Sequence, residues 1–71
     1  MNSENYNENH EVEEVMALGA DYFAALVYRV ESSGIQVFEA TKSIINQFEF
    51  RGTVSPRQAA SLLKFKYRYD P

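Results

Sequence analysis

His10 and the glutamates that follow it are the residues whose types and spacing come nearest to a metal site. His10 stands beside Glu11, Glu13 and Glu14. An imidazole with several carboxylates can hold a cation weakly, but a structural zinc site uses four Cys or His ligands. This chain has one histidine and no cysteine. The ordinary interpretation is a solvated, acidic helix start, so we predict no metal site and no cofactor.

Groups suited to catalysis are scarce. General acid–base and nucleophilic catalysis both need a reactive side chain held beside a partner in a concave site. The chain has no cysteine nucleophile, and it has no glycine-rich phosphate loop. Glu13 and Glu14 are adjacent, so on a helix their side chains point about 100° apart and do not form a carboxylate pair. A chain of 71 residues has little room for a pocket. We therefore expect no enzymatic activity.

Basic residues alternate with aromatic residues near the end of the sequence. Nucleic-acid-binding proteins combine cations for phosphates with flat rings on which bases stack. An acidic protein partner would suit the same cations, and a purely structural alternative packs the rings back on the first helix. The pI of about 5.0 opposes strong phosphate binding. The residues predicted to bind nucleic acid or an acidic partner are Arg57, Lys64, Lys66, Tyr67, Arg68 and Tyr69.

The first half of the chain carries the opposite charge. Residues 1–31 hold seven acids and one base, whereas residues 32–71 hold three acids and six bases, so the field of the molecule is dipolar. One interpretation is that the acidic and basic surfaces simply face each other or solvent in the fold. Alternatively, the acidic surface binds a protein by imitating phosphate charge. Tyrosines at its edge would suit such an interface. The predicted acidic and aromatic face consists of Glu11, Glu13, Glu14, Asp21, Tyr22 and Tyr28.

Apolar residues spaced by three and four predict a helix over residues 11–31, behind a polar and mobile tail at residues 1–10. Gly19 lies within the apolar stripe, where a glycine costs about 1 kcal/mol relative to alanine. Either another helix approaches closely there, or the helix kinks. The buried stripe is predicted to contain Val12, Val15, Met16, Phe23, Leu26, Val27 and Val30.

Two capping signals predict two further helices. Ser33 and Gln36 have the spacing of a capping box that would start a helix over residues 35–49. Gly52 suits the left-handed conformation that ends such a helix. The side of this helix predicted to be buried contains Val37, Phe38, Thr41, Ile44, Ile45 and Phe48.

The third helix has the clearest local signal. Ser55 is placed as N-cap, Pro56 as the first helical residue and Gln58 as the partner in a capping box, which predicts a helix over residues 55–67. Its apolar side is predicted to contain Ala59, Leu62 and Leu63, and Val54 could staple onto the first turn.

These elements predict an all-α fold, a small three-helix bundle in a single domain over residues 11–71. A core of this size rarely supplies more than about 3–5 kcal/mol, so a partner or self-association would supplement it. A homodimer through the wide apolar arc of the first helix is one such arrangement. The sequence has no apolar run long enough for a membrane span and no signal-peptide pattern, so we expect a cytoplasmic protein that does not bind membranes.

A helix, a turn and a second helix start occupy residues 43–60, which read SIINQFEFRGTVSPRQAA. This run resembles small accessory proteins of DNA metabolism encoded by phages and plasmids. The resemblance implies an inhibitor or adaptor that acts on a nuclease, polymerase or CRISPR effector in the host cytoplasm. We therefore predict a non-enzymatic protein-binding module. A nucleic-acid-binding protein that uses the basic aromatic C-terminus, and a structural homo-oligomer through the first helix, are the alternatives.

Overall fold

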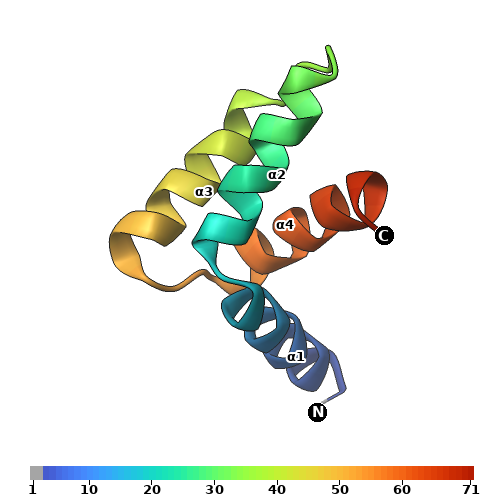
Figure 1. Ribbon diagram of the computed structural model, residues 1–71. Helices are drawn as coiled ribbons and strands as arrows, with labels where there is room; N and C mark the ends of the chain where they lie inside the picture. Colours follow the sequence, from blue (N-terminus) through green and yellow to red (C-terminus); the bar gives the residue numbers. More distant parts are fainter. Residues whose placement is uncertain (1–2) are drawn as a thin grey trace.

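Four α-helices make up the computed structural model, which describes the backbone of residues 3–71 and the side chains of residues 10–71. The helices are α1 (Ser3–Leu18), α2 (Ala20–Ser32), α3 (Glu39–Arg51) and α4 (Pro56–Tyr69). Residues 3–71 contain no strand. The predicted all-α class is confirmed. The predicted number of three helices is wrong, because the expected first helix is two helices (Figure 1).

Gly19 divides the predicted helix over residues 11–31. Its φ of 89° and ψ of 157° lie in a region that only glycine adopts readily. The backbone N–H of Gly19 still donates to Val15 O at 2.9 Å, so α1 closes its last turn before the chain changes direction. A Cβ built at Gly19 meets no atom within 4 Å. The prediction that another helix approaches closely at Gly19 is therefore wrong. The alternative, a kink, is confirmed, and the change of direction is large enough to separate α1 from α2.

The helix α1 begins at Ser3, ahead of the start expected at Glu11. Part of the tail expected at residues 1–10 is thus helical, while Met1 and Asn2 lie outside the described residues. The mobility of this segment stays a prediction.

The connection between α2 and α3 differs from the predicted capping box at Ser33 and Gln36. Ser33 ends α2 instead, and its Oγ donates to Val30 O at 2.8 Å. The hydroxyl is therefore engaged with the preceding helix. The helix α3 begins at Glu39 rather than at residue 35, with Phe38 at its N-cap and no side-chain cap.

The two signals further along the chain are confirmed. Gly52 ends α3 in the left-handed conformation, with φ of 79° and its N–H donating to Phe48 O at 2.7 Å. Ser55 caps α4 reciprocally with Gln58: each backbone N–H donates to the other residue's side-chain oxygen at 3.1 Å. These bonds satisfy donors that have no partner inside the helix. The helix α4 continues to Tyr69, past the predicted end at residue 67.

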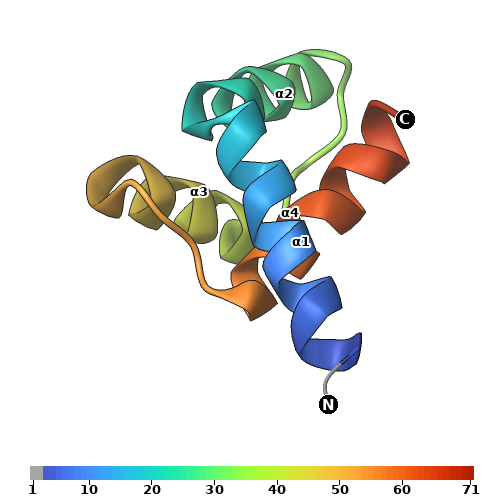
Figure 2. The same ribbon diagram turned by 90° about the horizontal axis from the view of Figure 1, so that it is seen from below.

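The helices α2 and α3 lie side by side, and α1 packs mainly against α4, which crosses beneath them (Figures 1 and 2). The largest fully buried side chains are Val15, Phe23, Leu26 and Leu62. Val54 is also buried, next to the start of α4. Met16 and Phe38 were predicted in the core but are 41% and 81% exposed. The break at Gly19 and the late start of α3 rotate these two side chains away from the core.

Helices long and apolar enough to cross a membrane are absent from the described part of the chain.

Candidate functional site

The helix α4 sorts the predicted basic and aromatic residues onto different sides. Arg57, Lys64 and Arg68 follow one another at intervals of seven and four residues, so they fall within about 40° of each other around the helix. All three are exposed, as is Ser61, which occupies the same face between them. We call Arg57, Lys64 and Arg68 the basic ridge. It runs along the outer side of α4, opposite the buried Leu62.

The cations of the basic ridge make no ion pair with any residue whose side chain the structure describes. Arg68 lies 5.6 Å from the centre of the Tyr69 ring, a cation–π contact that leaves its charge in solvent. By contrast, Lys42 Nζ pairs with Glu31 at 2.8 Å and with Glu39 at 3.8 Å. Besides the exposed Arg51 of α3, the exposed cations without an ion pair to a described side chain therefore lie on α4.

Lys66 and Tyr69 are half-buried on the same helix, whereas Tyr67 is exposed. Lys66 Nζ donates to the backbone oxygen of Asp70 at 3.0 Å and lies 4.5 Å from the centre of the Tyr67 ring. The Tyr69 ring meets the buried Phe65 edge-on, with ring centres 5.3 Å apart. These three side chains make intramolecular contacts.

A hydrogen bond joins the two predicted sites. The hydroxyl of Tyr67 donates to the carboxylate of Glu14 across the contact between α1 and α4. This bond, together with partial desolvation and the charges of Glu14 and Glu11, raises the pKa of Tyr67. The acidic helix start and the basic C-terminus thus meet at this point, although Tyr67 keeps 51% of its surface exposed.

The predicted acidic face does not form one surface. Glu11 and Glu14 are half-buried beside α4, whereas Glu13 is exposed and points away from them. Asp21 lies beyond the break, in the first turn of α2. Tyr28 is 75% exposed, while Tyr22 turns inward.

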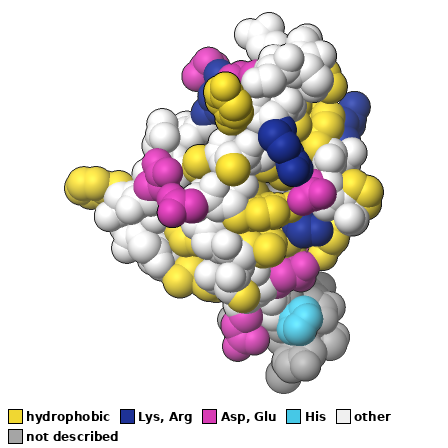
Figure 3. Space-filling view, viewed as in Figure 1, with side chains coloured by type: hydrophobic (Ala, Val, Ile, Leu, Met, Phe, Trp, Pro, Cys, Tyr) yellow, Lys and Arg dark blue, Asp and Glu magenta, His cyan; other side chains and the backbone are white. Residues whose placement is uncertain are grey.

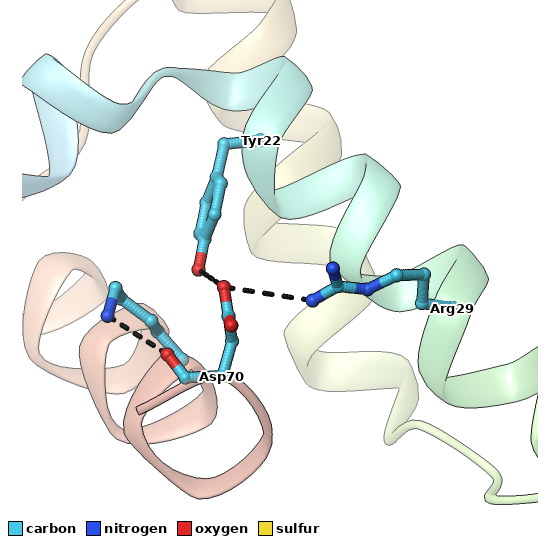
Figure 4. Close-up of polar contacts among 4 residues, drawn as sticks. Tyr22, Arg29 and Asp70 are labelled. Carbon is cyan, nitrogen blue, oxygen red and sulfur yellow. Dashed lines mark hydrogen bonds and ion pairs between the residues drawn. The ribbon is translucent and has the colours of Figure 1, made fainter.

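Tyr22, Arg29 and Asp70 hold the end of α4 against α2 (Figure 4). The Tyr22 hydroxyl donates to Asp70 Oδ2, and Arg29 Nη2 lies 3.7 Å from the same oxygen. We call this group the C-terminal clasp. Desolvation and the Asp70 carboxylate raise the pKa of Tyr22 to about 12. The hydrogen bond from Tyr22 and the charge of Arg29 lower the pKa of Asp70, against some desolvation.

Sequence reasoning missed Arg29 and Asp70 as partners of Tyr22. Tyr22 and Arg29 belong to α2, and Asp70 follows α4. Tyr22 and Asp70 are 48 positions apart in the sequence. No local spacing marks such a pair.

Residues 10–71 contain no group of three or more acidic or His side chains placed to hold a metal ion. One shallow hollow of about 420 Å³ lies at the junction of α1 and α2, beside the end of α3. A second one, of about 240 Å³, lies between α2 and Tyr69. Neither brings together a nucleophile and a base.

Comparisons with family models, with curated proteins and with solved structures find no match to this chain.

Proposed function

We propose that this protein is a non-enzymatic binding module that docks an acidic segment of a partner protein on its basic ridge. One observation carries the proposal: Arg57, Lys64 and Arg68 align on one exposed face without an ion-pair partner among the described side chains. Exposed charges of one sign along a helix attract a partner of opposite charge and orient it during the encounter.

A protein partner suits this surface better than a nucleic acid does. Single-strand binding relies on aromatic rings beside the cations, and here the tyrosines of α4 contact Glu14 and Phe65. Binding to phosphates also grows with the number of cations that meet them, and the ridge offers three.

The resemblance of residues 43–60 to phage and plasmid accessory proteins indicates which acidic partner to test first. It favours a subunit of a nucleic-acid-processing complex, on which this protein would act as an adaptor or inhibitor.

Fluorescence anisotropy with a labelled polyglutamate peptide and labelled single- and double-stranded oligonucleotides tests the proposal at about 50 and 200 mM salt, where phosphate contacts lose most affinity. We expect the peptide to bind at the lower salt concentration and the oligonucleotides to bind more weakly. Lys64→Gln should reduce peptide binding about two- to fivefold, on the scale of an exposed charge pair.

Arg51→Gln is the matched control, because it removes one exposed positive charge from α3 and leaves the basic ridge intact. Equal losses in Lys64→Gln and Arg51→Gln would reduce the effect to net charge and contradict the proposed site. Tighter binding of the oligonucleotides would assign the basic ridge to nucleic acid.

A further inference from the structure

The shallow hollow of about 420 Å³ lies where α1 ends, α2 begins and α3 ends. Part of its lining is apolar: Phe48 is buried, Ala20 is half-buried, and Met16 is exposed. Gly19 and Gly52 border the hollow, and neither position carries a side chain that could project into it. The hollow can therefore receive the apolar part of a ligand.

Two carboxylates, those of Asp21 and Glu49, line the same hollow. Both residues are exposed, and neither makes an ion pair with any side chain that the structure describes. Arg51 is close to Glu49 in the sequence, but a separation of two residues places it about 160° away around α3. Figure 3 shows acidic side chains together at the left of the molecule, where α2 begins and α3 ends, with the Lys and Arg atoms of this view above and to the right. The negative charge of the hollow is thus open to a ligand.

The ends of two helices add to this negative charge. Met16 belongs to the last turn of α1, and Phe48 and Glu49 belong to the last turn of α3. The last carbonyl groups of a helix have no partner within it and carry a partial negative charge. The start of α2 contributes a partial positive charge, which Asp21 in its first turn offsets. The hollow as a whole therefore favours a cation.

An apolar surface beside unpaired carboxylates is complementary to an aliphatic chain that ends in a cation. Lysine and arginine have this structure, and their methylene stems lie along apolar surfaces while the charged head stays at the polar edge. A small-molecule site buries most of its ligand, whereas a shallow hollow suits one side chain of a longer chain that stays outside. We propose that the hollow binds a basic segment of a partner protein. One Lys or Arg stem lies on Met16 and Phe48, and its cation faces Asp21 and Glu49.

This site is separate from the basic ridge. None of the residues that line the hollow belongs to α4. The protein would then hold an acidic segment on α4 and a basic segment at the junction of the other three helices, as an adaptor between two partners of opposite charge. Each site has its own ligand and its own test, so either can fail while the other stands.

Two-dimensional ¹H–¹⁵N NMR tests the proposal, because glycine amides report on the site directly. The chain has three glycines. Gly19 and Gly52 border the hollow, whereas Gly34 lies beyond the opposite end of α2. We titrate the protein with a capped tetralysine peptide at about 50 mM salt, where exposed charges are only weakly screened. The signals of Gly19 and Gly52 should shift and saturate while that of Gly34 stays in place, and a tetraglutamate peptide should leave all three unchanged.

Neutral variants then test the carboxylates. Asp21→Asn and Glu49→Gln should each weaken tetralysine binding about two- to fivefold, the effect of one exposed charge pair. Glu13→Gln is the matched control, because it removes an exposed carboxylate of α1 that does not line the hollow. This control should bind tetralysine as the wild type does, and far-UV circular dichroism should show the same helix content in all variants.

A pair of small cations tests the apolar surface. Butylammonium has the stem and the charge of one lysine side chain, whereas ammonium has the charge alone. At equal concentration, butylammonium should shift the signals of Gly19 and Gly52, and ammonium should not, because it has no stem to bury.

Several results would overturn the proposal. Glycine signals that tetralysine does not move would show that the hollow binds no basic segment. Equal losses in Glu13→Gln and in the two hollow variants would reduce the effect to net charge, and equal shifts with ammonium and butylammonium would exclude the apolar surface. Tighter binding of spermidine than of tetralysine would assign the hollow to a free polyamine. Shifts of Gly19 and Gly52 that depend on protein concentration alone would assign it to a second copy of the chain.

Discussion

Asp70 directly follows α4 and receives a hydrogen bond from Tyr22 of α2. Arg29 of α2 lies 3.7 Å from the same carboxylate, so these three side chains fix the end of α4 to α2. The bond from Tyr22 needs a protonated phenol, and an ionised carboxylate strengthens it. The C-terminal clasp therefore depends on pH at both ends of the scale.

Tyr22→Phe should lower the free energy of unfolding by about 1 kcal/mol at neutral pH, since one partly exposed hydrogen bond to a carboxylate is lost. Folding raises the pKa of Tyr22 from 10.0 to about 12. Its contribution is thus fully present below pH 10 and disappears as the pH rises through 12. Urea unfolding of the wild type between pH 9 and pH 12 should show this decline.

Tyr28→Phe is the control for this experiment, because Tyr28 is exposed and makes no hydrogen bond to the described residues. It should retain the wild-type decline, whereas Tyr22→Phe should lose the part due to the clasp. An identical pH dependence in Tyr22→Phe and the wild type would show that the clasp does not form. On the acid side, the lowered pKa of Asp70 means that its contribution is lost as the pH falls below the carboxyl's ordinary range.

At the scale of the elements, the two glycines that end helices have different conformational requirements. Gly52 adopts φ of 79° and ψ of 8°, a left-handed conformation that asparagine tolerates. Gly19 adopts φ of 89° and ψ of 157°, which is accessible essentially to glycine alone. Crowding plays no part, because a Cβ at either site meets nothing within 4 Å.

Gly19→Asn should therefore destabilise the protein by about 1–3 kcal/mol, the cost of a strained backbone conformation. Gly52→Asn should cost less than about 1 kcal/mol, because asparagine enters the left-handed region at little cost. Thermal unfolding followed by circular dichroism compares the two. Equal costs would mean that α1 and α2 join into one helix when Gly19 is replaced.

The same elements show how far the sequence alone can predict this fold. The start of α4 was predicted because Ser55 and Gln58 satisfy each other within one turn. The sequence does not decide the conformation at Gly19, since a glycine in an apolar stripe fits either a helix crossing or a kink. Ser33 was assigned to the wrong helix because its hydroxyl can bond forward or backward, and the backward bond to Val30 forms.

For the binding surfaces, helix periodicity predicts which residues share a face of one helix, but it does not predict contacts between helices. The positions of Arg57, Lys64 and Arg68 on one face follow from their spacing once α4 is known. The engagement of Tyr67 with Glu14, and of Tyr22 with Asp70, depends on how α1 and α2 pack against α4. Such contacts join residues far apart in the sequence, so no local pattern predicts them.

At the scale of the whole molecule, one small core connects all four helices. Val15 of α1, Phe23 and Leu26 of α2 and Leu62 of α4 are fully buried at its centre. The helix α3 adds Ile45 and Phe48 to the same cluster. A core shared in this way should unfold in a single cooperative transition.

Leu62→Ala should remove about 2–5 kcal/mol, as truncation of a buried leucine usually does. That loss is comparable with the total stability expected for a chain of this size, so most of the protein should be unfolded at 37 °C. Circular dichroism and one-dimensional NMR would report the loss of helix and of shifted methyl signals. Lys64→Ala, an exposed substitution on the same helix, should remain folded; a folded Leu62→Ala variant would contradict a single shared core.

The packing of α1 against α4 has a consequence for how the chain folds. The two helices are separated in the sequence by α2 and α3, yet each is the other's main neighbour (Figure 2). Until α1 meets α4, Val15 lacks part of the surface that buries it. Long-range contacts of this kind slow folding relative to bundles with only neighbouring contacts. The helices α2 and α3 are neighbours in the sequence and can pair as a hairpin first, whereas the contact between α1 and α4 closes the longest loop of the fold.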